Sequence, residues 1–103
     1  MKYRIEIADD ASAEAEDAYL WMMEQLSKEQ AEKWFDGLMD AIDTLSNSPK
    51  RCSLAPENVD SSEEIRQLLY GKGRGTYRIL FTVSESIVYV LHIRHASRQF
   101  LEL

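Results

Sequence analysis

The chain has 103 residues, of which 45% are apolar and 29% charged, so it has room for one core and is too apolar for a disordered protein. The net charge of -6 disfavours wholesale electrostatic binding of nucleic acid. No apolar run approaches the roughly 18 residues that span a membrane, the N-terminus lacks the apolar block of a signal peptide, and the single cysteine excludes an internal disulfide. We therefore expect one cytoplasmic domain over residues 1–103, with no membrane contact.

The charges are unevenly distributed along the chain. Residues 1–49 hold 12 acidic and 4 basic side chains, whereas residues 50–103 hold 6 acidic and 8 basic ones. Any anion-facing surface is therefore expected on the second half of the chain, and most acids of the first half are expected on solvated helix faces.

The first half predicts a strand followed by two helices. Residues 2–8 alternate polar and apolar side chains, as a half-buried strand does. Asp9, Asp10 and Ser12 suit the start of a helix that runs to about Leu26. Residues 27–30 (SKEQ) form a capping box for a second helix, which Asn47-Ser48-Pro49 ends. The tight joint predicts an αα-hairpin.

The second half predicts a polar loop over 47–64 and three strands, at 65–70, 76–83 and 87–95. The fold class is therefore α+β: an N-terminal strand, an αα-hairpin and a three-stranded antiparallel meander, with both helices on one face of one sheet. We expect all four strands to be antiparallel. The helix residues expected against the Ile79/Phe81/Val83 face are Tyr19, Met22, Trp34, Phe35, Leu38 and Ile42.

Two sets of basic residues could bind an anion. The turn Gly71-Lys72-Gly73-Arg74-Gly75 places two cations between glycines, although a flexible turn with solvated charges is the alternative. Arg66, Arg78 and Arg94 lie within predicted strands. Arg78 is expected on the face away from the helices, where it would bind a phosphate or carboxylate, or cover apolar surface with its stem.

The only two histidines are His92 and His95. They are three residues apart on a strand and should point to opposite faces, so they should not chelate one metal ion. No metal site and no cofactor are expected. Either histidine could act as a general base, or could simply be packed and hydrogen-bonded.

Three segments carry a family resemblance. Residues 65–81 (IRQLLYGKGRGTYRILF) resemble the central segment of RelE/ParE-type toxins of type II toxin–antitoxin systems. Residues 90–98 (VLHIRHASR) resemble the family's last strand and the residues after it, and residues 48–57 (SPKRCSLAPE) resemble the loop of the plasmid-stabilisation branch. The order of elements also matches, so the resemblance covers nearly the whole chain.

The resemblance implies one of two activities. RelE-like members cut mRNA in the ribosomal A site, whereas ParE-like members block DNA gyrase. Arg78 matches the phosphate-contacting arginine of the nuclease branch, and Arg98 matches the basic residue after the last strand. The nuclease branch also has two lysines on the preceding strand. Arg66 lies near the position of the first lysine, and Leu68 occupies the position of the second. The C-terminal tyrosine of some nucleases has no counterpart, and His95 could substitute for it.

We therefore prefer a toxin that binds an essential target, DNA gyrase, and is not an enzyme. The alternatives are a ribosome-dependent mRNA endonuclease, with Arg78, Arg98 and His95 as catalytic residues, and a decayed module that only binds its antitoxin. The expected target-binding residues are Arg66, Lys72, Arg74, Arg78 and Arg98, and Arg78 and Arg98 are expected to share one surface with the Lys72/Arg74 turn. A cognate antitoxin is expected to order as it binds, contacting Trp21 and Met23, in a hetero-oligomer.

Overall fold

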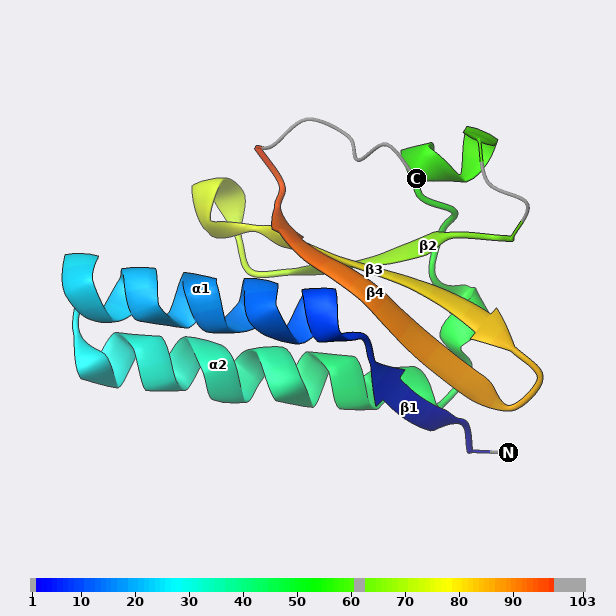
Figure 1. The fold of residues 1–103 in the computed structure, drawn as a ribbon, viewed down its shortest axis with the longest axis horizontal. Helices are drawn as coiled ribbons and strands as arrows, with labels where there is room; N and C mark the ends of the chain where they lie inside the picture. Colours follow the sequence, from blue (N-terminus) through cyan, green and yellow to red (C-terminus); the bar gives the residue numbers. More distant parts are fainter. Residues whose placement is uncertain (1, 61–62, 98–103) are drawn as a thin grey trace.

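A computed structural model describes residues 2–60 and 63–97. The helices run side by side along a twisted sheet (Figure 1). The elements, in chain order, are β1 (Arg4–Ile7), α1 (Asp9–Gln25), α2 (Lys28–Asp43), β2 (Arg66–Tyr70), β3 (Tyr77–Ser84) and β4 (Ile87–His95). This order confirms the predicted strand, αα-hairpin and three-stranded meander. No helix of the described residues is both long and apolar enough to cross a bilayer.

The sheet has the strand order β1-β4-β3-β2. β2, β3 and β4 pair antiparallel, as predicted, but β1 pairs parallel to β4. The expectation of a wholly antiparallel sheet is therefore wrong. The reason is topological: α1 and α2 return the chain to the end where β1 began, and Tyr3 N donates to Ser46 O there. β2 then runs in the same direction as β1, and β4, two reversals later, runs the same way.

The helix boundaries follow local chemistry. Ser27 Oγ accepts the Gln30 amide at 3.1 Å, which confirms the predicted N-cap of α2. α1 begins after Ala8 without a side-chain cap, and Asp9 and Asp10 occupy its first turn, where carboxylates favour the helix dipole. The segment between α2 and β2 contains short 3₁₀ turns at Thr44–Ser46, Pro49–Arg51 and Pro56–Asp60.

Both helices pack on one face of the sheet, as predicted. The main core joins Leu38 and Ile42 of α2 to Ile79 and Phe81 of β3, and Trp34 and Phe35 pack at its margin. Met22 is buried, and the Tyr19 ring packs edge-on against Phe35 of α2. On the opposite face a smaller cluster, Ala55, Ile65 and Leu80, lies under the loop before β2.

β4 contains a bulge that changes which side chains face the helices. Leu80 pairs with His92 and Phe81 with Val90, so Leu91 has no partner in β3. Without this extra residue the alternation from Val90 would turn His92 and Arg94 toward the helices. With it, Ile93 enters the core and His95 pairs with Tyr77.

Candidate target-binding groove

A groove of about 850 Å³ opens between the tip of the αα-hairpin and the end of the sheet. In Figure 1 the helices extend past the strands on this side, next to the turn between β2 and β3. We call it the basic groove. Its main lining residues are Trp21, Leu26, Lys33, Trp34, Arg74, Tyr77 and His95. Aromatic rings and two cations thus lie together in one open groove, a combination suited to binding rather than to core packing.

The floor of the basic groove is an aromatic cluster centred on Trp34. Its ring lies 5.0 Å from the Tyr77 ring and 6.2 Å from the Tyr70 ring, centroid to centroid. The Tyr70 hydroxyl donates to Trp34 O at 2.8 Å. Burial, with a smaller effect from the Asp40 carboxylate, raises the pKa of Tyr70 above its ordinary value of 10.0. The neutral hydroxyl is therefore the form that the fold favours.

Glycines shape the turn that supplies the cations. Gly71 has a φ of +100°, and a Cβ there would lie 2.4 Å from Gly75 O, so a side chain at this position would break the turn. Lys72 and Arg74 are exposed. Among the described residues neither they nor Lys33 has a carboxylate within ion-pair distance. These three cations are thus available to a ligand.

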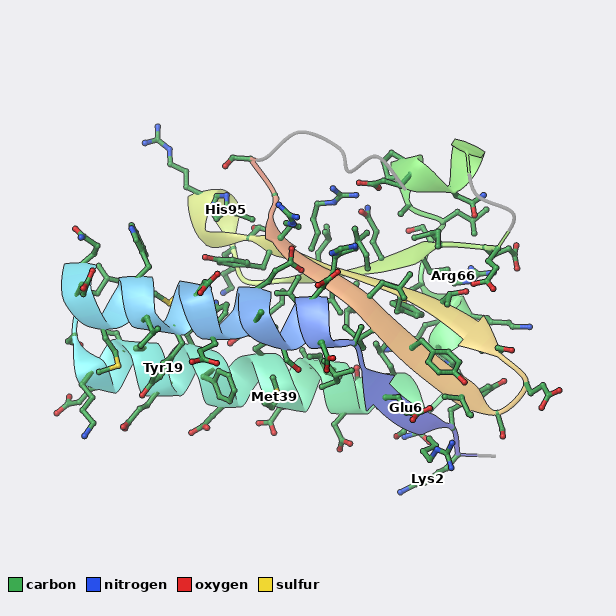
Figure 2. All side chains as sticks on the ribbon, viewed as in Figure 1. Lys2, Glu6, Tyr19, Met39, Arg66 and His95 are labelled. Carbon is green, nitrogen blue, oxygen red and sulfur yellow. The ribbon has the colours of Figure 1, made fainter. Side chains whose placement is uncertain are left out.

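His95 holds the glycine turn to the end of β4 (Figure 2). Its Nε2 lies 2.5 Å from Arg74 O, which can only accept, so we assign the proton to Nε2. Nδ1 then accepts the Ser97 amide at 3.1 Å. Both ring nitrogens are therefore engaged, and the ring packs edge-on against Tyr77.

Arg78 does not lie on the open surface where it was expected. Strand alternation correctly predicts that it points away from the helices, but it is only 5% exposed. The turn Pro56–Asp60 covers it: Nη2 donates to Glu57 Oε1 at 2.5 Å, and Nε donates to Gln67 Oε1 at 3.0 Å. The expectation that Arg78 shares an exposed surface with Lys72 and Arg74 is wrong, because this turn shields it.

The other expected basic residues differ in their surroundings. Arg66 donates to Cys52 O at 2.6 Å and to Lys50 O at 3.2 Å, and so secures the loop before β2. Arg98 lies outside the described residues. Within the described part of the chain, the structure brings together Lys72 and Arg74 of the expected target-binding set.

The sequence did not single out Lys33 or Glu14. Lys33 reaches the basic groove because it adjoins Trp34 on α2. Nothing in the sequence pattern around Lys33 marked it as a binding residue. Glu14 Oε1 accepts the Ile93 amide at 3.0 Å and lies 3.2 Å from His92 Nδ1, while Glu14 Oε2 lies 2.5 Å from Arg94 Nε. Since β1 pairs only as far as Val90, this carboxylate covers the edge of β4 that β1 leaves open.

The two residues expected to contact an antitoxin lie in different places. Trp21 is 56% exposed and lines the basic groove, whereas Met23 is 37% exposed and does not line it. Their roles can therefore be tested separately.

Comparisons with known proteins agree with this geometry. The family model described as "ParE toxin of type II toxin-antitoxin system, parDE" matches residues 5–100. A solved structure titled "Chromosomal ParDE TA system from P. aeruginosa" has a similar fold, with a TM-score of 0.73 and 15% identity, over 91% of this chain and 96% of that chain. No curated protein matches.

Proposed function

The chain belongs to the family of ParE toxins of type II toxin–antitoxin systems, and from this membership we propose that it arrests growth by binding DNA gyrase through the basic groove. The observation that carries the proposal is that Lys33 and Arg74, which have no carboxylate within ion-pair distance among the described residues, lie with exposed Trp21 in one open groove. Aromatic side chains and arginine are the residues that dominate protein interfaces.

The arrangement around His95 supports binding rather than RNA cleavage. Attack by a ribose hydroxyl needs a base within about 3 Å and cations beside the developing charge. In the described residues, His95 has both ring nitrogens engaged, and the guanidinium of Arg78 is paired with Glu57 beneath a turn. Neither group is placed to serve a phosphodiester in the groove.

The proposal includes a cognate antitoxin that covers the basic groove. Trp21 and Leu26, at 56% and 58% exposed, border the groove with the two cations. An antitoxin segment with apolar and acidic side chains would match this lining, and would order as it binds. Neutralisation then follows because toxin–target and toxin–antitoxin contacts use the same surface.

The test has two arms. Purified protein is added to gyrase with relaxed plasmid and ATP, and separately to translating ribosomes with mRNA. We expect inhibition of supercoiling and no codon-specific cuts. Arg74→Glu should weaken inhibition by about tenfold or more, because it reverses a groove charge, whereas Lys50→Glu, an exposed charge change outside the groove, should preserve it.

Codon-specific mRNA cuts that His95→Gln abolishes would overturn the proposal in favour of the endonuclease. Inactivity in both arms, with antitoxin binding retained, would favour the decayed module. Arg78→Ala is unsuitable as the diagnostic variant, because the loss of a buried ion pair would destabilise the protein by about 3–5 kcal/mol and so lower either activity.

A further inference from the structure

The glycine turn between β2 and β3 carries Arg74 into the basic groove without packing on either side of it. A Cβ at Gly73 or Gly75 would meet no atom within 4 Å, so the space beside the backbone on both sides of Arg74 is open. Glycine also loses more backbone freedom than any other residue when its conformation is fixed. Hydrogen bonds, rather than packing at these positions, must therefore hold Arg74 in place.

The hydrogen bond from His95 differs in origin from the others in the turn. Two amides of the segment 72–76 donate to carbonyls of the same segment, at 3.0 and 3.3 Å. The bond from His95 Nε2 to Arg74 O, at 2.5 Å, comes instead from the end of β4, 21 residues later in the sequence. Within the described part of the chain, this is the hydrogen bond that ties the turn Gly73–Gly75 to another element.

The surroundings of His95 hold its imidazole in the form that can make this bond. The Ser97 amide, which can only donate, lies 3.1 Å from Nδ1, and the Ser97 hydroxyl lies 2.6 Å from the same nitrogen. Nδ1 therefore keeps its lone pair, and the proton belongs on Nε2. The Tyr77 ring, edge-on with its centroid 5.1 Å from that of the imidazole, packs beside it. Ser97 and Tyr77 thus present His95 to the turn as a donor.

We propose that His95 is a positioning residue for target binding. Its hydrogen bond orders the glycine turn, so that Arg74 is already in place when the target enters the basic groove. Fixing a flexible cation in advance lowers the entropy that is lost on binding. His95 acts through Arg74 and needs no contact of its own with the target. This inference rests on the proposed function, since it takes the basic groove as the surface that the target enters.

The first measurement uses the free chain and does not involve the target. ¹⁵N relaxation should give order parameters of about 0.8 for the Arg74 and Gly75 amides in the parent and below about 0.6 in His95→Phe. This variant keeps a ring beside Tyr77 but removes the donor. His95→Gln should restore the order, because Nε2 of glutamine can donate to the same carbonyl. The matched control is His92→Phe, the same change on the same strand outside the basic groove, which should leave the turn ordered.

The second measurement is a double-mutant cycle on the inhibition of gyrase. His95→Phe and Arg74→Ala should each raise the concentration of protein needed for half inhibition by about fivefold or more. The double variant should match Arg74→Ala within about twofold, because a positioning residue has no effect once the residue that it positions is gone. His95→Gln should recover most of the inhibition that His95→Phe loses. Urea denaturation checks that each variant is folded, and His95→Asn, whose shorter amide does not reach the carbonyl, replaces His95→Phe if that variant is not.

Four results would each overturn the proposal: an ordered turn in His95→Phe, equal loosening in His92→Phe, no recovery in His95→Gln, or additive effects of His95→Phe and Arg74→Ala. A parent protein that does not inhibit gyrase would instead overturn the proposed function, and with it the role of His95 toward that target. The relaxation data would still decide, in that case, whether His95 orders the turn.

Discussion

Arg78 shows how one side chain can join distant parts of the chain. Strand alternation predicts which face of β3 carries Arg78. It does not predict that a turn covers this side chain, because Glu57 lies 21 residues earlier in the sequence. Removing both charges from water is costly, and the pair is tolerable because Gln67 also bonds the guanidinium. The turn Pro56–Asp60 is thereby fixed over the sheet face that the helices leave uncovered.

At this buried pair, Glu57→Ala should lower the free energy of unfolding by about 3–5 kcal/mol, since it leaves an uncompensated guanidinium inside the fold. The exposed pair of Arg4 and Glu6, 3.6 Å apart, provides the control, and Glu6→Ala should cost less than about 1 kcal/mol. Urea denaturation measures both variants. Equal effects would show that the Glu57 contact is as solvated as the surface pair.

Tyr70 should make the protein sensitive to alkali. Because burial raises its pKa above 10.0 in the folded state, the folded protein holds the phenolic proton more tightly than the unfolded chain does. The contribution of Tyr70 to stability is therefore complete below the unfolded pKa and is lost as the pH rises through the folded pKa. Urea denaturation at increasing pH should show a shallower decline for Tyr70→Phe than for the parent. Identical slopes would refute this assignment.

Regular elements were predictable because their signals are local. The capping box at Ser27, the strand alternation around Ile79 and the glycine turn each depend on a few adjacent residues. The bulge at Leu91 was not predictable, since the extra residue appears only in the register with β3. The parallel pairing of β1 was missed because it depends on the whole path of the chain.

Gly37 couples α2 to β2. A Cβ at this position would lie 2.1 Å from the Tyr70 hydroxyl oxygen and 3.1 Å from the ring carbon that carries it. Gly37→Ala should therefore be destabilising, although alanine alone favours a helix by about 1 kcal/mol, because it disrupts the Tyr70–Trp34 hydrogen bond. In a Tyr70→Phe background the same change should be neutral or stabilising.

A double-mutant cycle in urea measures this coupling, which we expect to be about 1 kcal/mol or more. Additive effects of the two changes would mean that α2 and β2 adjust independently, and the close approach at Gly37 would then have no energetic consequence.

The molecule as a whole separates its charges. The carboxylates Glu16, Glu32 and Asp36 line a groove between α1 and α2, whereas the glycine turn brings Arg74 to the basic groove beside the tip of the hairpin. The acidic first half and basic second half of the sequence predicted this separation of charge, but they did not predict which residues form each surface. Lys33, from the acidic half, joins the basic groove because α2 passes beneath it. Folding, not sequence distance, determines which cations act together.

Trp21 and Met23 lie on the same helix, but only Trp21 lines the basic groove. Trp21→Ala should reduce growth arrest and the affinity for the cognate antitoxin by about tenfold or more, because exposed tryptophans in grooves carry much of the binding energy. Met23→Ala should leave growth arrest intact. Both side chains are exposed, so the free energy of unfolding should change by less than about 0.5 kcal/mol in either variant.

Growth after induction, antitoxin affinity and urea denaturation are measured on the same pair of variants. A stable Trp21→Ala variant that still arrests growth fully would place the target-facing surface away from the basic groove. A Met23→Ala variant as inactive as Trp21→Ala would instead mean that the whole hairpin tip contacts the target. If the target enters between the helices and the glycine turn, growth arrest should be lost in the Trp21→Ala variant and kept in the Met23→Ala variant.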